Sequence, residues 1–317
     1  MGMTTERTVK YGYVIDDIVR ASEISEFDDG IQARSDGNGG YILEVSIVDA
    51  TSISIGSSDD RQSADRIETD YARGISMLPK NSSISRLSFY KNRKRPAFTF
   101  SFPFDGEYSL IRGPGLSMEL TLFTTVENLS YGTAEKVISN SKMKYHGDLF
   151  LCYLLARNLF RKGDQECELD PGIIGLEMQG GYNGSHRAHM LVNNAMVLVN
   201  ISFASFCTEH GIPAIYRKYR QGDAYAYYCA EPTIHDGVGS FYAQITSPLR
   251  RRSDLMNCRN LDSYFKGVEF PHGQHEIEEF VLRANRKAED DRAFSASNSW
   301  TKGSSPLKVS FASLLNR

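Results

Sequence analysis

The chain has 317 residues, enough to bury a sizeable hydrophobic core as one large domain or two smaller ones. Its 41% hydrophobic and 24% charged residues are ordinary for a soluble globular protein. A net charge of -3 excludes nucleic-acid binding through bulk positive charge, although a local basic channel remains compatible with it.

Cysteine usage and apolar runs indicate the compartment. The five cysteines are scattered and include no C-x-x-C pair, which predicts neither a disulfide framework nor a zinc ribbon. The charged N-terminus does not resemble a signal peptide. The longest apolar stretches, residues 149–160 and 195–207, are shorter than a bilayer span. We therefore expect a reduced, cytoplasmic protein with no membrane partner.

Alternating apolar residues predict strands in the first third of the chain. Such alternation runs over residues 41–47, after a Gly-Gly turn, and over 98–104, where four phenylalanines are spaced by two. The Asp105-Gly106 pair then predicts a hairpin turn into residues 108–110.

Helical patterns follow the strands. Residues 149–162 predict an apolar helix, and Ser185 is a candidate cap of a long buried helix that reaches about Thr208. Apolar residues between 277 and 288 recur at helical spacing.

This order of elements predicts an α+β, or mixed α/β, class, with a β-rich N-terminal part packed against helices from the C-terminal half. We expect one domain over residues 1–297 and a tail over 298–317.

An acidic segment near the N-terminus is the first candidate functional feature. Residues 22–30 carry four carboxylates within seven residues, and Asp16 and Asp17 precede them. Such a cluster repels itself unless it binds a cation. Divalent ions such as Mg²⁺ take oxygen ligands, and two of them can activate water and stabilise the leaving oxygen in phosphodiester cleavage. The alternative is a solvated acidic loop.

A basic segment at residues 242–255 is the second feature. A Thr-Ser-Pro turn is followed by Arg250, Arg251 and Arg252, next to a predicted helix start. Guanidinium groups and free backbone N–H groups together predict a phosphate clamp. The alternative is a helix start with basic surface residues.

Short sequence blocks occur in a fixed order between residues 15 and 259. They are Ile15-Asp16 with Glu26–Gly30, Val45–Thr51, Arg73–Pro79, Arg95–Thr99 with Asp105–Glu107, Leu129–Tyr131, His189–Asn200, Ile212–Arg217, and Thr246–Leu255 with Arg259. In this order the blocks resemble the catalytic (RNB) domain of the ribonuclease II and ribonuclease R family.

The resemblance implies a function and a catalytic site. Family members hydrolyse single-stranded RNA from the 3′ end to nucleoside 5′-monophosphates and use Mg²⁺, with Mn²⁺ as an alternative ion. Arg250 matches the arginine that stabilises the phosphate charge. Because four extra residues precede Glu26, Asp17 or Glu23 are alternatives to Asp16 as the first ligand. The implied catalytic residues are Asp28, Arg250, Glu26 and Asp29, and the implied metal ligands are Asp16, Glu26, Asp28 and Asp29.

The implied RNA contacts depart from the family pattern. Two asparagines stand where the family has glutamates in the buried helix, and a methionine stands near the position of a base-stacking aromatic. Base stacking is worth about 1–3 kcal/mol per base, so we expect a weaker grip on the RNA end. The implied RNA-binding residues are Arg251, Arg217, Asn193, Asn194, Tyr242 and Met77.

Full-length relatives add cold-shock and S1 domains, which the resemblance does not extend to. We therefore expect two binding partners: single-stranded RNA, and a protein that replaces these domains. Two alternatives stay open: an RNA-binding pseudoenzyme or accessory protein, and a specialised nuclease with a narrow RNA substrate or a toxin role.

Overall fold

The computed structural model describes residues 7–17, 25–71, 73–111, 117–159, 185–220, 223 and 226–300, with side chains up to residue 290. These residues fall into two compact units. The first unit holds the described chain up to residue 159 together with residues 185–200 and 245–255, and the second unit holds the remainder. The candidate acids and Arg250 belong to the first unit, whereas Arg217 and Tyr242 belong to the second.

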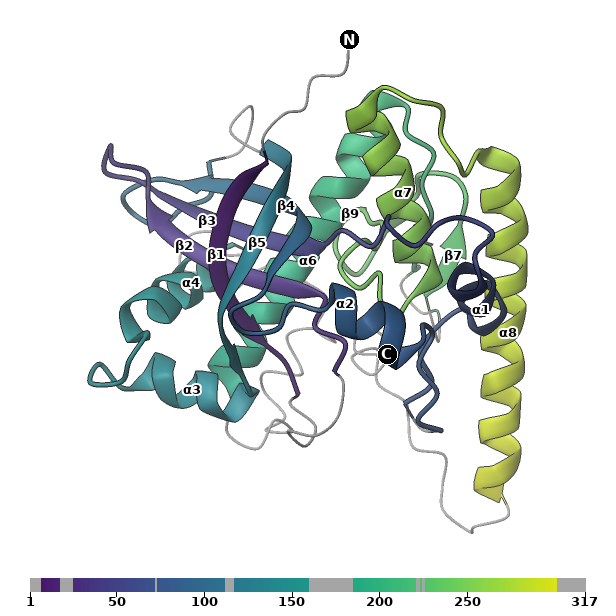
Figure 1. Ribbon diagram of the computed structural model, residues 1–317, viewed down its shortest axis with the longest axis horizontal. Helices are drawn as coiled ribbons and strands as arrows, with labels where there is room; N and C mark the ends of the chain where they lie inside the picture. Colours follow the sequence, from purple (N-terminus) through teal and green to yellow (C-terminus); the bar gives the residue numbers. More distant parts are fainter. Residues whose placement is uncertain are drawn as a thin grey trace. The chain divides into compact units, whose positions relative to one another are not determined.

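A closed barrel of five strands forms the centre of the first unit (Figure 1). Neighbouring strands are antiparallel except for β1 and β5, which run parallel and close the barrel. The strands are β1 (Thr8–Ile15), β2 (Asp29–Ser35), β3 (Tyr41–Val48), β4 (Lys94–Phe104) and β5 (Ser117–Leu129).

The two strands predicted from alternation are confirmed as β3 and β4. Phe98 pairs with Ile47 and Phe100 with Val45, so alternate residues of both strands share one buried side. The hairpin predicted after β4 is shorter than expected. The Asp105 side chain closes the turn, but only an isolated bridge from Phe104 to Leu110 follows it.

Close packing inside the barrel requires a glycine in β2. A β-carbon at Gly30 would collide with the ring of Phe123, which is 1% exposed. Only a residue without a side chain therefore lets β2 lie over this ring.

Helices complete the first unit. Ser57 and Ser130 cap α1 and α3 by accepting hydrogen bonds from backbone N–H groups three residues later. The helical segments are α1 (Ser58–Arg66), a π-helical turn η1 (Lys80–Ile84), α2 (Ser85–Leu87), α3 (Tyr131–Ser139), α4 (His146–Asn158) and the start of α6 (His186–His210).

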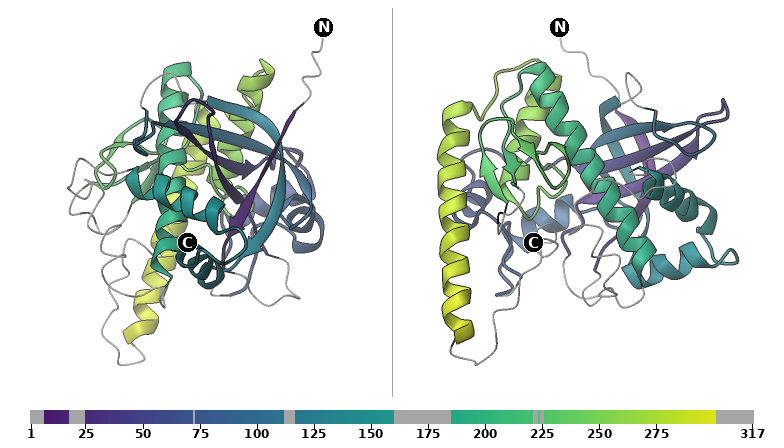
Figure 2. Two further views of the ribbon diagram at one scale, coloured as in Figure 1. Left: turned by 90° about the vertical axis from the view of Figure 1, so that its left-hand side faces the viewer. Right: turned by 180° about the vertical axis from the view of Figure 1, so that it is seen from behind.

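The long buried helix predicted from residue 185 is confirmed as α6, a single continuous helix (Figure 2). It ends before Gly211, whose φ of 63° is left-handed. The helix predicted over residues 149–162 is α4, which ends at Asn158, before the predicted end at residue 162. Residues 160–162 lie outside the described chain.

Within the described chain, α6 is long and apolar enough to cross a membrane by length and composition alone. It is longer than the apolar stretch recognised in the sequence. However, 61% of its apolar window is buried inside the structure, as is usual for the core helix of a soluble protein.

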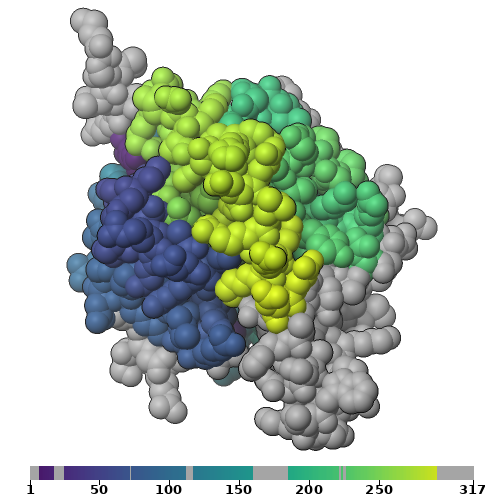
Figure 3. Space-filling model, turned by 90° about the vertical axis from the view of Figure 1, so that its right-hand side faces the viewer, coloured from purple at the N-terminus to yellow at the C-terminus, as the bar shows by residue number. Residues whose placement is uncertain are grey.

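The second unit continues α6 and adds two small hairpins and two helices. The late amphipathic helix predicted from residues 277–288 is confirmed: Ile277 and Phe280 of α8 are buried, while Leu282 is 73% exposed. Figure 3 shows the described part of α8, in yellow, at the surface. This helix extends past the domain boundary expected at residue 297. The elements are β6 (Tyr216–Lys218), β7 (Tyr227–Cys229), β8 (Ile234–His235), β9 (Ser240–Phe241), α7 (Arg252–Lys266), whose first turn belongs to the first unit, and α8 (Gln274–Trp300).

A hydrophobic cluster of the first unit connects the barrel with the basic segment. Phe27 and Phe123 share this cluster with Leu249 and Leu255. Because Phe27 lies within the acidic motif, and Leu249 and Leu255 lie on either side of the arginines, their burial in one cluster brings the two candidate segments together.

Candidate active site

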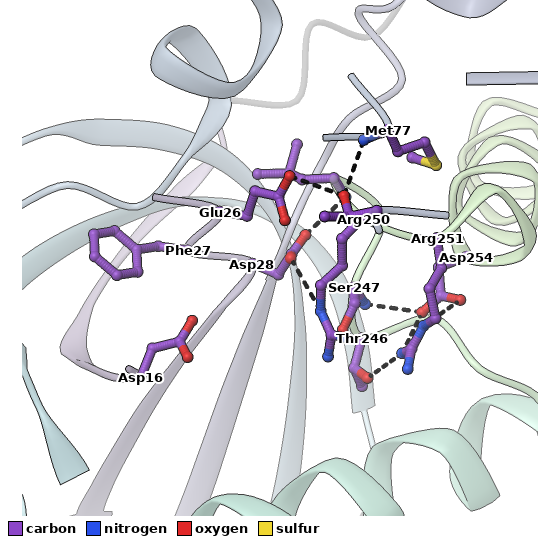
Figure 4. Close-up of polar contacts among 12 residues, drawn as sticks. Asp16, Glu26, Phe27, Asp28, Met77, Thr246, Ser247, Arg250, Arg251 and Asp254 are labelled. Atoms are coloured by element: carbon purple, nitrogen blue, oxygen red, sulfur yellow. Dashed lines mark hydrogen bonds and ion pairs between the residues drawn. The ribbon is translucent and has the colours of Figure 1, made fainter. Parts of the chain in front are cut away.

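The ends of β1 and β2 position the acidic residues. Asp16 follows β1 directly and Asp29 begins β2. Since the two strands are antiparallel, with Tyr13 opposite Ile31, both acids lie at the same end of the strand pair. Glu26 and Asp28 lie on the segment that enters β2 (Figure 4).

Asp28 lies against the basic segment. Its Oδ1 accepts a hydrogen bond of 2.8 Å from the Leu249 N–H, and its Oδ2 lies 3.9 Å from the Nε of Arg250 (Figure 4). Asp28 is 3% exposed, and within the described chain its Oδ2 has no hydrogen-bond partner. Burial raises the pKa of Asp28 well above its ordinary value, although Arg250 and the Leu249 N–H oppose this.

Arg250 supplies the positive charge of the site. Its side chain is 21% exposed. Burial lowers the pKa of Arg250, but its electrostatic interactions with Tyr71, Asp28 and Asp16 outweigh burial and raise the pKa above its ordinary value. The guanidinium therefore stays charged and can donate hydrogen bonds to an anion.

Two hydroxyl groups hold Glu26. The Thr69 Oγ1 donates to Glu26 Oε1 over 3.0 Å, and the Tyr71 hydroxyl donates to Oε2 over 2.9 Å. Burial raises the pKa of Glu26, and both hydroxyl groups partly offset this. The Thr69 N–H also donates to the Arg250 carbonyl over 2.9 Å. Thr69 therefore joins the acidic segment to the arginine.

The pKa values of Asp16 and Asp29 are both raised. Burial raises the pKa of Asp16 to about 6; the Asp17 N–H and Arg250 oppose this rise, and the charges of Asp17 and Glu26 add to it. Burial and the charge of Asp16 raise the pKa of Asp29 to about 7. The carboxylates thus lie close enough to disfavour one another's ionisation, which a cation would relieve.

Four residues near these acids were missed from the sequence. Besides Thr69 and Tyr71, the ring of Tyr131 stacks on His189 with 3.8 Å between centroids. Burial raises the pKa of Tyr131, and the charges of Asp16 and Asp29 add to this effect. Tyr131 and His189 stand in recognised sequence blocks, but no pattern in the sequence marks Thr69 or Tyr71.

The acids offer carboxylate oxygens to a divalent cation. No group of three or more His, Cys, Asp or Glu side chains within the described residues is already assembled to hold a metal ion. The Oδ2 of Asp28, which accepts no hydrogen bond within the described chain, and the mutual repulsion of the carboxylates nevertheless fit a divalent cation. Mg²⁺ usually takes one or two carboxylates, water and substrate phosphate, so it does not need a complete protein cage.

Arg251 and Arg252 have structural positions. Arg251 donates to both carboxylate oxygens of Asp254, over 3.0 and 2.7 Å, and to Thr246 over 3.3 Å, and it is 3% exposed (Figure 4). Arg252 is buried in an ion pair with Asp60. The phosphate contact expected for Arg251 therefore does not fit the structure, because the side chain is buried and its Nε and Nη2 groups donate to Asp254 and Thr246.

Met77 and Tyr242 are likewise misplaced for RNA contact. Met77 is 0% exposed within the hydrophobic cluster, so it offers no surface to a base. Tyr242, in the second unit, is 3% exposed, and its ring packs at 5.3 Å from that of His235. Both roles were predicted from sequence position, and the burial of both side chains contradicts them.

The remaining predicted contacts are untested. Asn193 is half-buried, and Asn194 donates to the Ala156 carbonyl over 2.9 Å, which ties α6 to α4. In the second unit, the Arg217 guanidinium lies 4.2 Å from the ring centroid of Tyr228. Their binding of RNA stays a prediction.

A barrel of this topology, with buried acids facing an arginine, defines a candidate phosphodiesterase centre. The model of the RNB domain family matches residues 17–228, more than half of the chain. The chain belongs to the RNB family. This match ends before Arg250, whose assignment rests on the sequence blocks and on its position beside Asp28.

Two curated relatives are ribonucleases. An uncharacterized ribonuclease from Synechocystis is 24% identical, over 88% of this chain and 46% of its own length. Exoribonuclease 2 from Edwardsiella piscicida is 22% identical, over 79% of this chain and 49% of its own length. The chain spans about half the length of these relatives.

Solved structures share the fold. A Dss1 exoribonuclease active-site mutant from Candida glabrata matches with a TM-score of 0.73 and 17% identity, over 95% of this chain and 47% of that one. Mycoplasma genitalium RNase R in complex with ribose-methylated single-stranded RNA gives 0.63 and 15%, over 90% and 57%. Yeast Ssd1, a pseudonuclease, gives 0.65 and 14%, over 88% and 43%. The mixed α/β class is thereby confirmed.

Proposed function

We propose that the chain is a Mg²⁺-dependent exoribonuclease that hydrolyses single-stranded RNA from the 3′ end to nucleoside 5′-monophosphates. The observation that carries this proposal is the contact between Asp28 and the basic segment: a buried carboxylate with one oxygen bonded to Leu249 N–H and the other beside Arg250. The ribonuclease relatives and the RNA-bound RNase R structure support RNA as the substrate.

The reaction breaks the bond between phosphorus and the 3′ oxygen of the preceding nucleotide. A water oxygen forms the new bond to phosphorus, and the proton that it releases ends on the departing 3′ oxygen. Bound Mg²⁺ would activate the water and neutralise phosphate charge. Arg250 would donate to the non-bridging oxygens, where negative charge develops. Asp16, Glu26, Asp28 and Asp29 would hold the cation, and Mn²⁺ could take the same oxygen ligands.

A single assay tests the proposal. A 5′-labelled single-stranded RNA is incubated with the protein in Mg²⁺, in EDTA, and with Asp28→Asn. Asp65→Asn is the matched control, because Asp65 is an exposed acid of α1. In Mg²⁺, the wild type and Asp65→Asn should give a ladder that shortens from the 3′ end, with nucleoside 5′-monophosphates as products. The RNA should stay intact in EDTA and with Asp28→Asn. Wild-type activity in Asp28→Asn would contradict the proposal.

An RNA-binding pseudoenzyme is the second candidate function. Asn193 and Asn194 carry no charge, and no metal cage is assembled among the described residues. The similarity to yeast Ssd1, a pseudonuclease, is consistent with this candidate. It predicts RNA that stays intact in every arm of the assay while binding the protein without Mg²⁺.

A further inference from the structure

A basic turn precedes β4. Residues 91–95 read Lys-Asn-Arg-Lys-Arg, four cations in five positions of a chain whose net charge is -3. The first four of these residues are exposed and Arg95 is partly exposed. Such a local concentration of one charge gives the turn a positive potential that the charge of the whole chain does not give.

Most of this charge is not neutralised by neighbouring acids. Lys91 forms an ion pair with Glu127 over 2.6 Å. Among the described residues, no acid forms an ion pair with Arg93, Lys94 or Arg95. The Nε of Arg95 is buried and has no hydrogen-bond partner in the part of the chain that the structure describes. Burial and the charge of Arg93 also lower the pKa of Arg95, as expected for like charges that lie close together. An anionic ligand would relieve this repulsion.

Hydrogen bonds to β5 hold the backbone of the turn. The Asn128 side chain accepts from the Lys91 N–H over 2.7 Å and donates to the Phe89 carbonyl over 2.9 Å. The Asn92 N–H donates to the Thr125 carbonyl over 2.8 Å, and Asn92 has a left-handed φ of 58°. Because the backbone is already ordered, a ligand would have to order only the long side chains.

The segment before the turn is attached to the acidic segment of the candidate active site. The Phe89 N–H donates to the Phe27 carbonyl over 3.1 Å. The Tyr90 hydroxyl accepts from the Ser25 N–H over 3.0 Å and donates to the Ser25 carbonyl over 3.2 Å. Glu26 lies between these two contacts, and the basic turn begins at the residue after Tyr90. The turn therefore lies next to the segment that carries Glu26, within one compact unit.

We propose that Arg93, Lys94 and Arg95 bind backbone phosphates of single-stranded RNA, a few nucleotides 5′ of the scissile bond. Proteins that bind single strands of any sequence follow the phosphate backbone with cationic side chains. The inference rests on the proposed function, because an RNA whose 3′ end lies at the acids brings its upstream nucleotides to this turn. The RNB domain itself would then contact RNA beyond the scissile phosphate.

The salt dependence of RNA binding tests the inference without hydrolysis. A fluorescent RNA of about 16 nucleotides is titrated in EDTA at several salt concentrations. Each phosphate contact to a single strand contributes about 0.7 to the slope of log affinity against log salt. Arg93→Gln/Lys94→Gln should therefore reduce this slope by about 1.4, which makes binding about 25-fold weaker at about 0.1 M salt if the two lines meet at about 1 M. Lys142→Gln/Lys144→Gln is the matched control, since it removes two exposed charges from the turn before α4, and it should change the slope by less than about 0.5.

Two more variants separate charge from damage to the fold. Glu127→Gln leaves Lys91, whose side chain is 49% exposed, without its acidic partner. It should increase the slope by about 0.7 and tighten binding about 5-fold at about 0.1 M salt. A damaged fold would not bind RNA more tightly. Arg93→Lys/Lys94→Arg keeps both charges and should keep the wild-type slope.

Hydrolysis of two substrates separates the inference from the proposed function. With RNA of about 16 nucleotides in Mg²⁺, Arg93→Gln/Lys94→Gln should lower kcat/KM by about the factor by which it weakens binding at that salt concentration. A dinucleotide has its only internucleotide phosphate at Arg250, so the same variant should cleave it within about 3-fold of the wild-type rate.

Three results would overturn the inference. An unchanged slope in Arg93→Gln/Lys94→Gln, or an equal change in the lysine control, would show that this turn holds no phosphate. Weaker binding by Glu127→Gln would contradict the role of the positive charge. An equal loss with the dinucleotide would place the effect at the catalytic centre. A wild-type protein that neither binds nor degrades RNA would instead refute the proposed function itself.

Discussion

Adjacent arginines in the basic segment should respond to substitution in opposite ways. Arg251 is 3% exposed and makes a two-pronged ion pair with Asp254, which is 0% exposed. Replacing Arg251 by methionine leaves this carboxylate buried with only its bonds from Ser247 N–H and Ser253 Oγ. Removing one partner of a buried ion pair typically costs about 3–5 kcal/mol.

That loss of stability should be easy to measure. For a chain of this size it corresponds to a fall in melting temperature of roughly 4–8 °C. Thermal melts followed by circular dichroism give the value for Arg251→Met. Replacing Arg251 and Asp254 together with apolar residues should recover part of the loss, because neither charge then remains unpaired.

Arg250→Met is the matched comparison. Arg250 is more exposed and lies 3.9 Å from Asp28, so we expect a melting temperature within about 3 °C of the wild type. RNA hydrolysis by this variant should fall by about 100- to 1,000-fold, as for other groups that stabilise charge in a transition state. If Arg251→Met melted like the wild type but bound RNA weakly, Arg251 would be a phosphate contact and the structural role assigned to it would be wrong.

Three further changes test other parts of the structure. Thr69→Val removes the hydroxyl that holds Glu26 and should lower kcat/KM by about 10-fold, whereas Thr69→Ser should retain most activity; equal effects of both would contradict this positioning role. Because burial and Asp16 raise the pKa of Asp29 to about 7, the metal-free fold binds protons that the unfolded chain does not between about pH 4 and pH 7. Stability in EDTA should therefore rise as the pH falls from about 8 to about 5.5, and Asp29→Asn should reduce this dependence in thermal melts; a profile unchanged by the variant would refute the assignment. Gly30→Ala should lower the free energy of unfolding by about 1–3 kcal/mol in urea, since its methyl group would collide with Phe123, and Phe123→Leu should partly rescue it.

The sequence determined the elements with strong periodicity. The alternation at residues 41–47 and 98–104 predicted β3 and β4, and the apolar run after Ser185 predicted α6. Strands β1, β2 and β5 were not predicted. In β5, buried residues alternate with half-buried ones, so the difference between its two sides is small and the pattern is weak.

The sequence also determined the residue types of the candidate site. Acids followed at long range by an arginine segment, in the order of the family blocks, predicted that Asp28 and Arg250 act together. They are 222 positions apart, and the structure places Asp28 Oδ2 at 3.9 Å from Arg250 Nε. The order of the family blocks along the chain is enough to predict this contact, because proteins with the same blocks in the same order share the fold that brings them together.

Only the tertiary structure decided which side chains are available to a substrate. Arg250 and Arg251 are neighbours in sequence, yet one faces the acids and the other is enclosed with Asp254. Met77 is enclosed in the core, while Tyr71 is exposed with its hydroxyl at Glu26. Burial depends on contacts between segments far apart in the chain, so no local pattern of residue types records it.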